Sequence, residues 1–263
     1  MEIIRDCACD VGYIRFGSGS RTFVILPGLS IGSVLDSADQ IAEAYEPFTE
    51  DYTVYLFDRK NTVPENYNIE QMADDTAAAM EAAGLHDADL FGASQGGMIG
   101  QIIAANHPEL VHKLVLGSSV TRVDGHAEEV VNNWLDLAAR REGVRLLLDF
   151  GEKIYPKEVF DQFKSGLKLI GEKVSDEELD RFITLATAAK GFDMTGRLSL
   201  IKCPVFAIGS RDDKVFGPEA LKDLEQAFEG RPDFESYYYD GYGHAAFDTA
   251  PDYKQRILAF LNH

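Results

Sequence analysis

The sequence predicts an α/β fold built around one mostly parallel sheet. Over residues 1–120, short apolar runs typical of buried strands alternate with helix-like stretches, the pattern of βαβ units. Strand-like runs return after residue 198, which indicates that the same sheet continues there. Ligands of such sheets bind at the carboxyl ends of the strands, so we expect the functional residues at that edge.

The elements of the first part follow in a regular order. Val11–Phe16 alternates apolar and polar residues, and after a Gly/Ser break Thr22–Leu26 is apolar, so we expect a β-hairpin. Further strands are predicted at Tyr52–Phe57, Ala88–Phe91 and Lys113–Leu116. Helices are predicted at Asp36–Tyr45, Ile69–Ala83 and Gly96–Asn106.

Residues 121–197 predict a helical cap inserted into this core. Their helix-like stretches are Glu128–Glu142, Gly143–Phe150, Lys157–Ile170 and Asp176–Ala189, with no convincing strand between them. The expected organisation is therefore a core of residues 1–120 and 198–263 with a cap or lid at 121–197. Large apolar residues of this segment, such as Trp134, Phe160 and Phe163, are expected to pack inside the cap. In the second core part, strands are predicted at Val205–Ile208 and Glu235–Tyr239, and helices at Pro218–Phe228 and Asp252–Leu261.

Charge and composition narrow the class of partner. The formal net charge of -19 and a pI of about 4.6 disfavour nucleic acid and anionic membranes, so we expect a small-molecule substrate. No apolar run approaches the length that spans a bilayer, and the first ten residues lack a secretory pattern. The three cysteines cannot all pair and have no zinc-like spacing, which favours a reducing, cytoplasmic setting without a metal. The sequence leaves the oligomeric state open.

A serine stands in a sequence context suited to a nucleophile. Gly92-Ala93-Ser94-Gln95-Gly96 follows a predicted strand and opens a predicted helix. A sharp strand-to-helix turn needs small neighbours, and it projects the serine Oγ above the sheet edge. The alternative is a Gly-rich turn whose serine has no catalytic role, and it is less consistent with a strand before the motif and a helix after it. The Gln95 backbone N–H, at the helix start, is a candidate donor to an oxyanion.

Further residues lie where the partners of a catalytic serine are expected, in loops next to predicted strands. His244 alone among the six histidines lies in a Gly-rich loop between a late strand and the last helix, and imidazole suits proton transfer at neutral pH. Asp212 and Asp213 end the Val205–Ile208 strand, and either could orient the histidine. A second oxyanion donor is expected after an early strand, where the Leu29 N–H is the candidate.

A charged pair also ends the Tyr52–Phe57 strand. Asp58-Arg59 could brace the loops around the site, but charged pairs at strand ends are most often solvated. We therefore assign it no catalytic role from the sequence.

These motifs together resemble the α/β-hydrolase superfamily over nearly the whole chain, most weakly in the insertion. Gly92–Met98 is similar to the family's nucleophile elbow and Gly243-His244 to its base loop. Gly209-Ser210-Arg211-Asp212 resembles the family's acid site, so the resemblance selects Asp212. Pro27 stands where many members have His, and the glycines usual after Asp58 are missing.

The resemblance implies a serine hydrolase with the triad Ser94, Asp212 and His244, an oxyanion hole from Leu29 and Gln95, and no cofactor. A serine in place of an aspartate nucleophile disfavours epoxide hydrolases and haloalkane dehalogenases. Carboxylic ester hydrolysis through an acyl-enzyme is the leading expectation. C–C bond hydrolysis, a lyase reaction or acyl transfer on the same triad remain alternatives, as does a ligand receptor that retains the triad.

Overall fold

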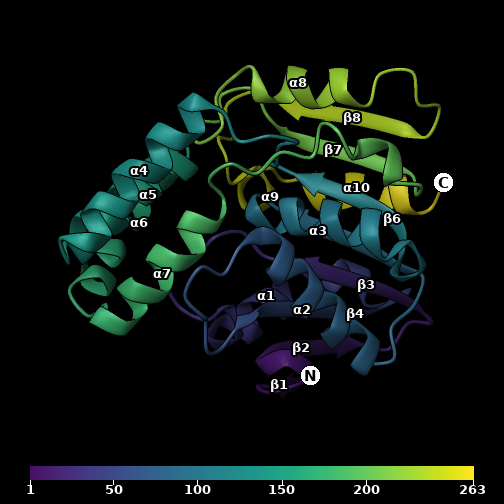
Figure 1. Cartoon of the computed structure of the whole chain (residues 1–263), viewed down its shortest axis with the longest axis horizontal. Helices are drawn as coiled ribbons and strands as arrows, with labels where there is room; N and C mark the ends of the chain where they lie inside the picture. Colours follow the sequence, from purple (N-terminus) through teal and green to yellow (C-terminus); the bar gives the residue numbers. More distant parts are fainter.

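The computed structural model describes all 263 residues as a three-layer α/β core with a group of helices at one end (Figure 1). An eight-stranded sheet runs in the order β1-β2-β4-β3-β5-β6-β7-β8. The strands are β1 (Glu2–Ile4), β2 (Val11–Gly17), β3 (Arg21–Leu26), β4 (Tyr52–Lys60), β5 (Ala88–Ala93), β6 (Val111–Gly117), β7 (Val205–Ser210) and β8 (Phe234–Tyr239). Neighbours from β4 to β8 are all parallel, so the predicted fold class is confirmed.

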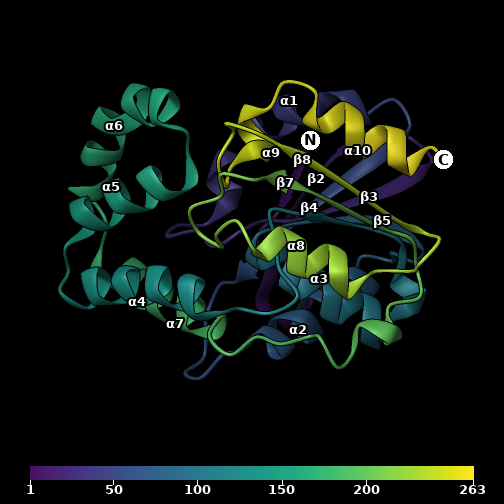
Figure 2. The ribbon, with the colours of Figure 1, turned by 90° about the horizontal axis from the view of Figure 1, so that it is seen from above.

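Helices cover both faces of the sheet (Figure 2). One face carries α1 (Ala38–Ala44), α9 (Ala246–Thr249) and α10 (Tyr253–Leu261), and the other carries α2 (Ile69–Ala82), α3 (Gln95–Asn106) and α8 (Ala220–Ala227). Strand β3 shows why both faces are apolar, because Phe23 and Ile25 belong to one buried cluster and Val24 and Leu26 to the other. This alternation follows from the two-residue period of a strand.

The predicted hairpin of Val11–Phe16 and Thr22–Leu26 is wrong. Strand β4 lies between β2 and β3, antiparallel to the first and parallel to the second. β3 is apolar on both faces and therefore takes a central position, whereas β2 pairs instead with the short edge strand β1, which the sequence did not indicate. The strands β2 and β3 are thus adjacent in sequence but separated in the sheet by β4.

Between β6 and β7 the chain forms four helices and no strand, here called the helical insertion: α4 (Gly125–Ala139), α5 (Gly143–Ile154), α6 (Lys157–Gly171) and α7 (Asp176–Ala188). These bounds match the predicted helices to within a few residues. Figure 1 shows the insertion beside the carboxyl ends of the strands. Two backbone hydrogen bonds join its ends. The Val123 N–H donates to the Phe192 carbonyl oxygen at 2.9 Å, and the Met194 N–H donates to the Thr121 carbonyl oxygen at 2.8 Å.

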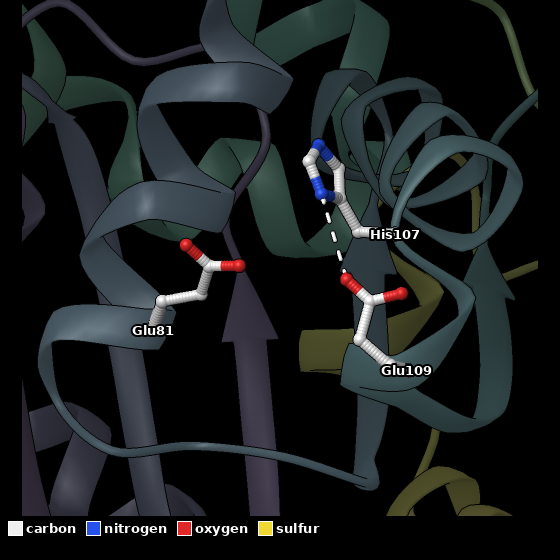
Figure 3. A group of neighbouring side chains, drawn as sticks. All are labelled: Glu81, His107 and Glu109. Atoms are coloured by element: carbon white, nitrogen blue, oxygen red, sulfur yellow. Dashed lines mark ion pairs between the residues drawn. The ribbon is translucent and has the colours of Figure 1, made fainter.

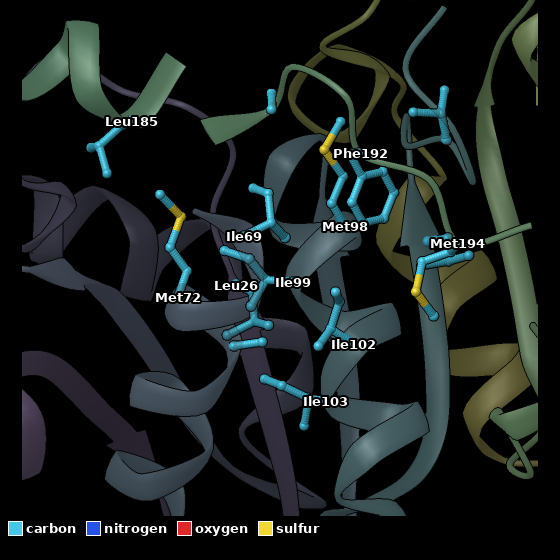
Figure 4. Packing of buried hydrophobic residues seen from close by; sticks show 14 of the residues in the cluster. Leu26, Ile69, Met72, Met98, Ile99, Ile102, Ile103, Leu185, Phe192 and Met194 are labelled. Carbon is cyan, nitrogen blue, oxygen red and sulfur yellow. The ribbon is translucent and has the colours of Figure 1, made fainter. Parts of the chain in front are cut away.

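The helical insertion packs on the core through one buried hydrophobic cluster that joins α7 to α3. Leu185 of α7 and Phe192 and Met194 after it belong to the same buried cluster as Met98 and Ile99 of α3 (Figure 4). Trp134 and Phe160 are buried as expected, but Phe163 is an exception because it is 54% exposed on α6. None of the helices is both long and apolar enough to cross a bilayer.

Candidate active site

The backbone at Ser94 makes the sharp turn that its sequence context indicates. Ser94 joins β5 to α3 with φ 52° and ψ −119°, a conformation that L residues rarely adopt. A Cβ at Gly96 would lie 2.1 Å from the Leu26 carbonyl oxygen, and one at Gly92 would lie 2.4 Å from the Gly96 oxygen. Close backbone approach thus requires both glycines of the motif.

His244 is held by a buried carboxylate. Its Nδ1 lies 2.7 Å from Oδ2 of Asp213, and the two side chains are only 5% and 4% exposed. The other Asp213 oxygen accepts the backbone N–H groups of Val215 (2.7 Å) and Phe216 (3.1 Å). Asp213 is therefore fixed by its own loop and presents one oxygen to the imidazole.

The choice of Asp212 as partner of His244 is corrected by this geometry. Asp212 is more exposed, and its Oδ1 accepts the Ser210 hydroxyl and the Gly241 N–H, the latter at 2.9 Å. Although partial burial acts to raise it, these hydrogen bonds hold the pKa of the Asp212 carboxyl below its ordinary value. Asp212 thus holds the loop that carries His244, while its neighbour Asp213 contacts the ring itself.

The two proposed oxyanion donors lie beside the serine. A Cβ at Gly28 would come within 3.3 Å of Ser94 Cβ and 3.9 Å of Ser94 Oγ, so the Gly28 backbone lies directly beside the Ser94 side chain. The Leu29 N–H donates no hydrogen bond within the structure. Gln95 is the first residue of α3, where helical N–H groups lack intrahelical partners.

The candidate site residues border one cavity. It has a volume of ≈ 80 Å³ and is bordered by Gly28, Leu29, Ser94, Gln95 and His244. Its remaining walls come mainly from the insertion and the loop after β7, namely Met98, Val131, Trp134, Phe150, Ile154, Ala189, Val215, Phe216 and Phe247. No lining side chain carries a permanent charge. The cavity therefore suits a small, uncharged group at the serine.

The pair Asp58-Arg59 is buried rather than solvated as the sequence favoured, and Arg59 contacts the residues beside Ser94. Arg59 is only 4% exposed, and its Nη2 donates to the Pro27 carbonyl oxygen at 2.6 Å. Its Nε also lies 3.4 Å from Oε1 of Gln95. Burial lowers the pKa of the Arg59 guanidinium to about 10, while the adjacent Asp58 carboxylate opposes that fall, so the cation persists at neutral pH. Its position at the carboxyl end of a strand was the available signal.

Gln95 and Asp58, the neighbours of Arg59, also connect the core to the helical insertion. Gln95 Nε2 donates to the Leu185 carbonyl oxygen in the last turn of α7 at 2.7 Å. Asp58, which accepts the Ser33 hydroxyl at 2.6 Å, lies 3.8 Å from the Arg181 guanidinium on α7. Helix α7 is thereby anchored to the residues around the Leu29 loop.

A family model described as the alpha/beta hydrolase fold matches residues 21–251. The chain belongs to this family. The expected resemblance is thus confirmed at the level of the superfamily, and it supports a hydrolase activity.

Named relatives of this α/β-hydrolase cover most of its length. Proteins called "Putative carbamate hydrolase RutD" from Rhizobium rhizogenes and Pseudomonas syringae pv. syringae are each 27% identical, over 252 and 234 residues. The first alignment covers 92% of this chain and 93% of the relative, and the second covers 81% and 85%.

Solved structures agree in fold. The enzyme MGS-M2 from a Medee basin deep-sea metagenome library has a TM-score of 0.86 at 21% identity, covering 100% of this chain and 98% of that one. The enol-lactonase from Burkholderia xenovorans LB400 has a TM-score of 0.80 at 20% identity, with complete coverage of both chains. At these identities the likeness concerns the fold alone.

A second group of titratable residues lies elsewhere on this α/β-hydrolase. Glu81, His107 and Glu109 bring ligand-type atoms within 4.8 Å of one another near the carboxyl ends of α2 and α3 (Figure 3). His107 Nδ1 is 3.8 Å from Glu109 Oε1, and both glutamates are exposed. Since α3 begins directly after Ser94 and His107 follows its far end, this group has no part in the cavity.

The crowding at the elbow predicts a large effect of Gly96→Ala on folding. We expect a loss of about 3 kcal/mol or more in unfolding free energy, because the new methyl group meets the backbone oxygens of Leu26 and Pro27. Gly125→Ala is the matched control, since a methyl group added there, at the start of α4, would meet no atom within 4 Å outside its chain neighbours and its own helix. Denaturant unfolding should find that control unchanged or slightly stabilised. Equal stability of the two variants would contradict the crowding argument.

Proposed function

We propose that the chain is a serine hydrolase that cleaves small uncharged acyl compounds, short esters and carbamates, through an acyl-enzyme. The observation that carries this proposal is the cavity at which Ser94, His244, Leu29 and Gln95 meet, with His244 bonded to buried Asp213. Acyl transfer needs a nucleophile, a base held in one tautomer and donors for a developing oxyanion.

The proposed chemistry follows from the hydrogen-bond roles. A carboxylate only accepts hydrogen bonds, so the proton of neutral His244 resides on Nδ1 against Asp213 and leaves Nε2 as the base. Ser94 Oγ attacks the substrate carbonyl carbon while its proton passes to Nε2. The imidazolium then protonates the leaving oxygen or nitrogen, the carbonyl bond re-forms, and the acyl-enzyme results. Water, deprotonated by His244, releases the acid and regenerates the serine.

Backbone donors complete the proposed oxyanion hole. The N–H groups of Leu29 and Gln95 would face the oxygen that becomes negative during attack. Arg59 supports this arrangement as a positioning residue, because its guanidinium holds the Pro27 carbonyl two residues before Leu29 and lies beside the Gln95 side chain.

Cavity size and charge guide the substrate class. A volume of ≈ 80 Å³ leaves room for only a few non-hydrogen atoms at the serine. The lining has no charged side chain to pair with an ionic substrate, and burying an unpaired charge is costly. The names of the RutD relatives add carbamates to the esters expected from the sequence, and a carbamoyl group is small and uncharged.

Loss of the nucleophile provides the first test. Ser94→Ala should reduce turnover of methyl acetate and methyl carbamate by about 10⁶-fold, the cost of removing a triad nucleophile. Intact mass after fluorophosphonate treatment should show one adduct in the wild type and none in Ser94→Ala. Exposed Ser199→Ala is the control and should keep the adduct. Unchanged turnover in Ser94→Ala would refute the proposal, and product analysis would separate hydrolysis from acyl transfer.

The two neighbouring aspartates provide a second test. Asp213→Asn should lower kcat by about 10⁴-fold, because an amide can stabilise the wrong histidine tautomer. Asp212→Asn keeps a carbonyl oxygen for the loop N–H groups, so we expect a loss of about tenfold at most. Steady-state kinetics on both variants decides the matter, and the reverse ranking would restore Asp212 as the acid.

Arg59 provides a third test. Arg59→Met should lower kcat by about 10²-fold, comparable to the loss of one oxyanion donor, with a smaller change in KM. Lys60→Met is the matched control, because Lys60 pairs with Asp75 at 2.9 Å and makes no hydrogen bond to Pro27 or Gln95. A kcat within threefold of wild type in a folded Arg59→Met protein would show that the contacts of Arg59 are dispensable for turnover.

A further inference from the structure

A second cavity shares a wall with the cavity at Ser94 and His244, which is here called the reaction cavity. The second cavity has a volume of ≈ 270 Å³ and is here called the hinge cavity, because it is bordered by residues at both ends of the helical insertion and by α8. Its lining includes Thr121, Arg122, Thr195, Gln226 and Ala227. Phe216 is the one residue that lines both the hinge cavity and the reaction cavity.

Phe216 is placed to act as a partition. It is only 6% exposed, and its ring meets the His244 ring edge-to-face with the centroids 5.2 Å apart. Its backbone N–H donates to Asp213 at 3.1 Å, and the next-but-one residue before it, Lys214, offers its carbonyl oxygen to His126 Nε2 of α4 at 3.2 Å. The loop backbone is therefore held on both sides, so the movable part of this shared wall is the Phe216 side chain.

The chemistry of the hinge cavity is polar without a dominant charge. Arg122 lies 3.8 Å from Asp223, and Asp124 accepts the Ala127 N–H at the start of α4. Arg122 and Asp223 thus offset one another at the exposed rim of the cavity, and the Gln226 carboxamide, also exposed there, makes no hydrogen bond to another residue. Free amide groups favour uncharged partners that both donate and accept.

We propose that the hinge cavity is a second subsite, which takes the tail of acyl substrates that end in an uncharged amide or hydroxyl group, and that the Phe216 ring is the gate to it. This inference rests on the proposed hydrolase function. Short acyl groups occupy the reaction cavity alone, and longer ones displace the ring and extend towards α8. Phe216 is on this view a specificity-determining residue.

The test compares methyl acetate with methyl 6-amino-6-oxohexanoate, because the methyl leaving group is small and only the tail needs room. The quantity measured is the ratio of kcat/KM for the long ester to that for the short one, followed by proton release. Ala227→Trp should fill the hinge cavity and lower this ratio at least tenfold. Phe216→Ala should raise it at least tenfold, and Phe216→Leu provides a milder opening if the alanine variant does not fold.

The double variant Phe216→Ala with Ala227→Trp separates the gate from simple enlargement. It should lose the gain of Phe216→Ala. Phe150→Ala is the matched control, because Phe150 borders the reaction cavity but not the hinge cavity, so any change it makes in the ratio should persist with Ala227→Trp. A ratio within twofold of wild type in Ala227→Trp overturns the proposal.

Failure of the hydrolase function would be seen separately, as no turnover of either ester and no phosphonate adduct in the wild type. Saturation-transfer NMR with hexanamide then tests the subsite without any reaction. Binding that is weakened at least fivefold by Ala227→Trp supports the hinge cavity as a ligand site. Absent binding, or equal binding to wild type and Ala227→Trp, overturns it.

Discussion

The backbone of Ser94 occupies a conformation that the surrounding residues must enforce. Its N–H donates to the Gly117 carbonyl oxygen at 2.8 Å, and its own carbonyl oxygen accepts the Ser119 hydroxyl at 2.9 Å. The end of β6 thus clamps both sides of the Ser94 residue, while Gly96 lets the end of β3 approach from the other direction. Strained backbone of this kind persists only where neighbouring structure over-determines it. The position of the Leu29 loop, and through it the proposed oxyanion hole, depends on this packing.

The helical insertion is bonded to both halves of the site. On the Ser94 side, the Gln95 side chain donates to the Leu185 carbonyl oxygen of α7, and on the His244 side the Ala245 N–H donates to the Ile154 carbonyl oxygen at the end of α5 at 2.8 Å. Movement of the insertion away from the core would break both hydrogen bonds. The insertion therefore does more than cover the cavity, because two separate contacts couple its position to the geometry around Ser94 and His244.

Sequence patterns predicted the order of elements and the elbow because these depend on local features: apolar period, strand length and small residues around Ser94. The pairing of β2 with β4 depends on which strands are buried on both faces, and no local pattern contains that information. Asp212 and Asp213 are adjacent in the chain, so their roles depend on a loop conformation that turns one carboxylate inward. Arg59 was undervalued for a similar reason, since exposure at a strand end is set by the loop that covers it.

The strongly acidic charge bears on the proposed reaction through its product. Hydrolysis of an uncharged ester would create a carboxylate inside an uncharged, largely apolar cavity, where an unpaired ion is poorly solvated. A protein with a formal net charge of -19 adds a repulsive field for anions at its surface. Both effects favour departure of the acid over its retention, whereas an uncharged substrate enters without opposing that field. For the proposed reaction, the cavity lining and the net charge would therefore both promote release of the anionic product.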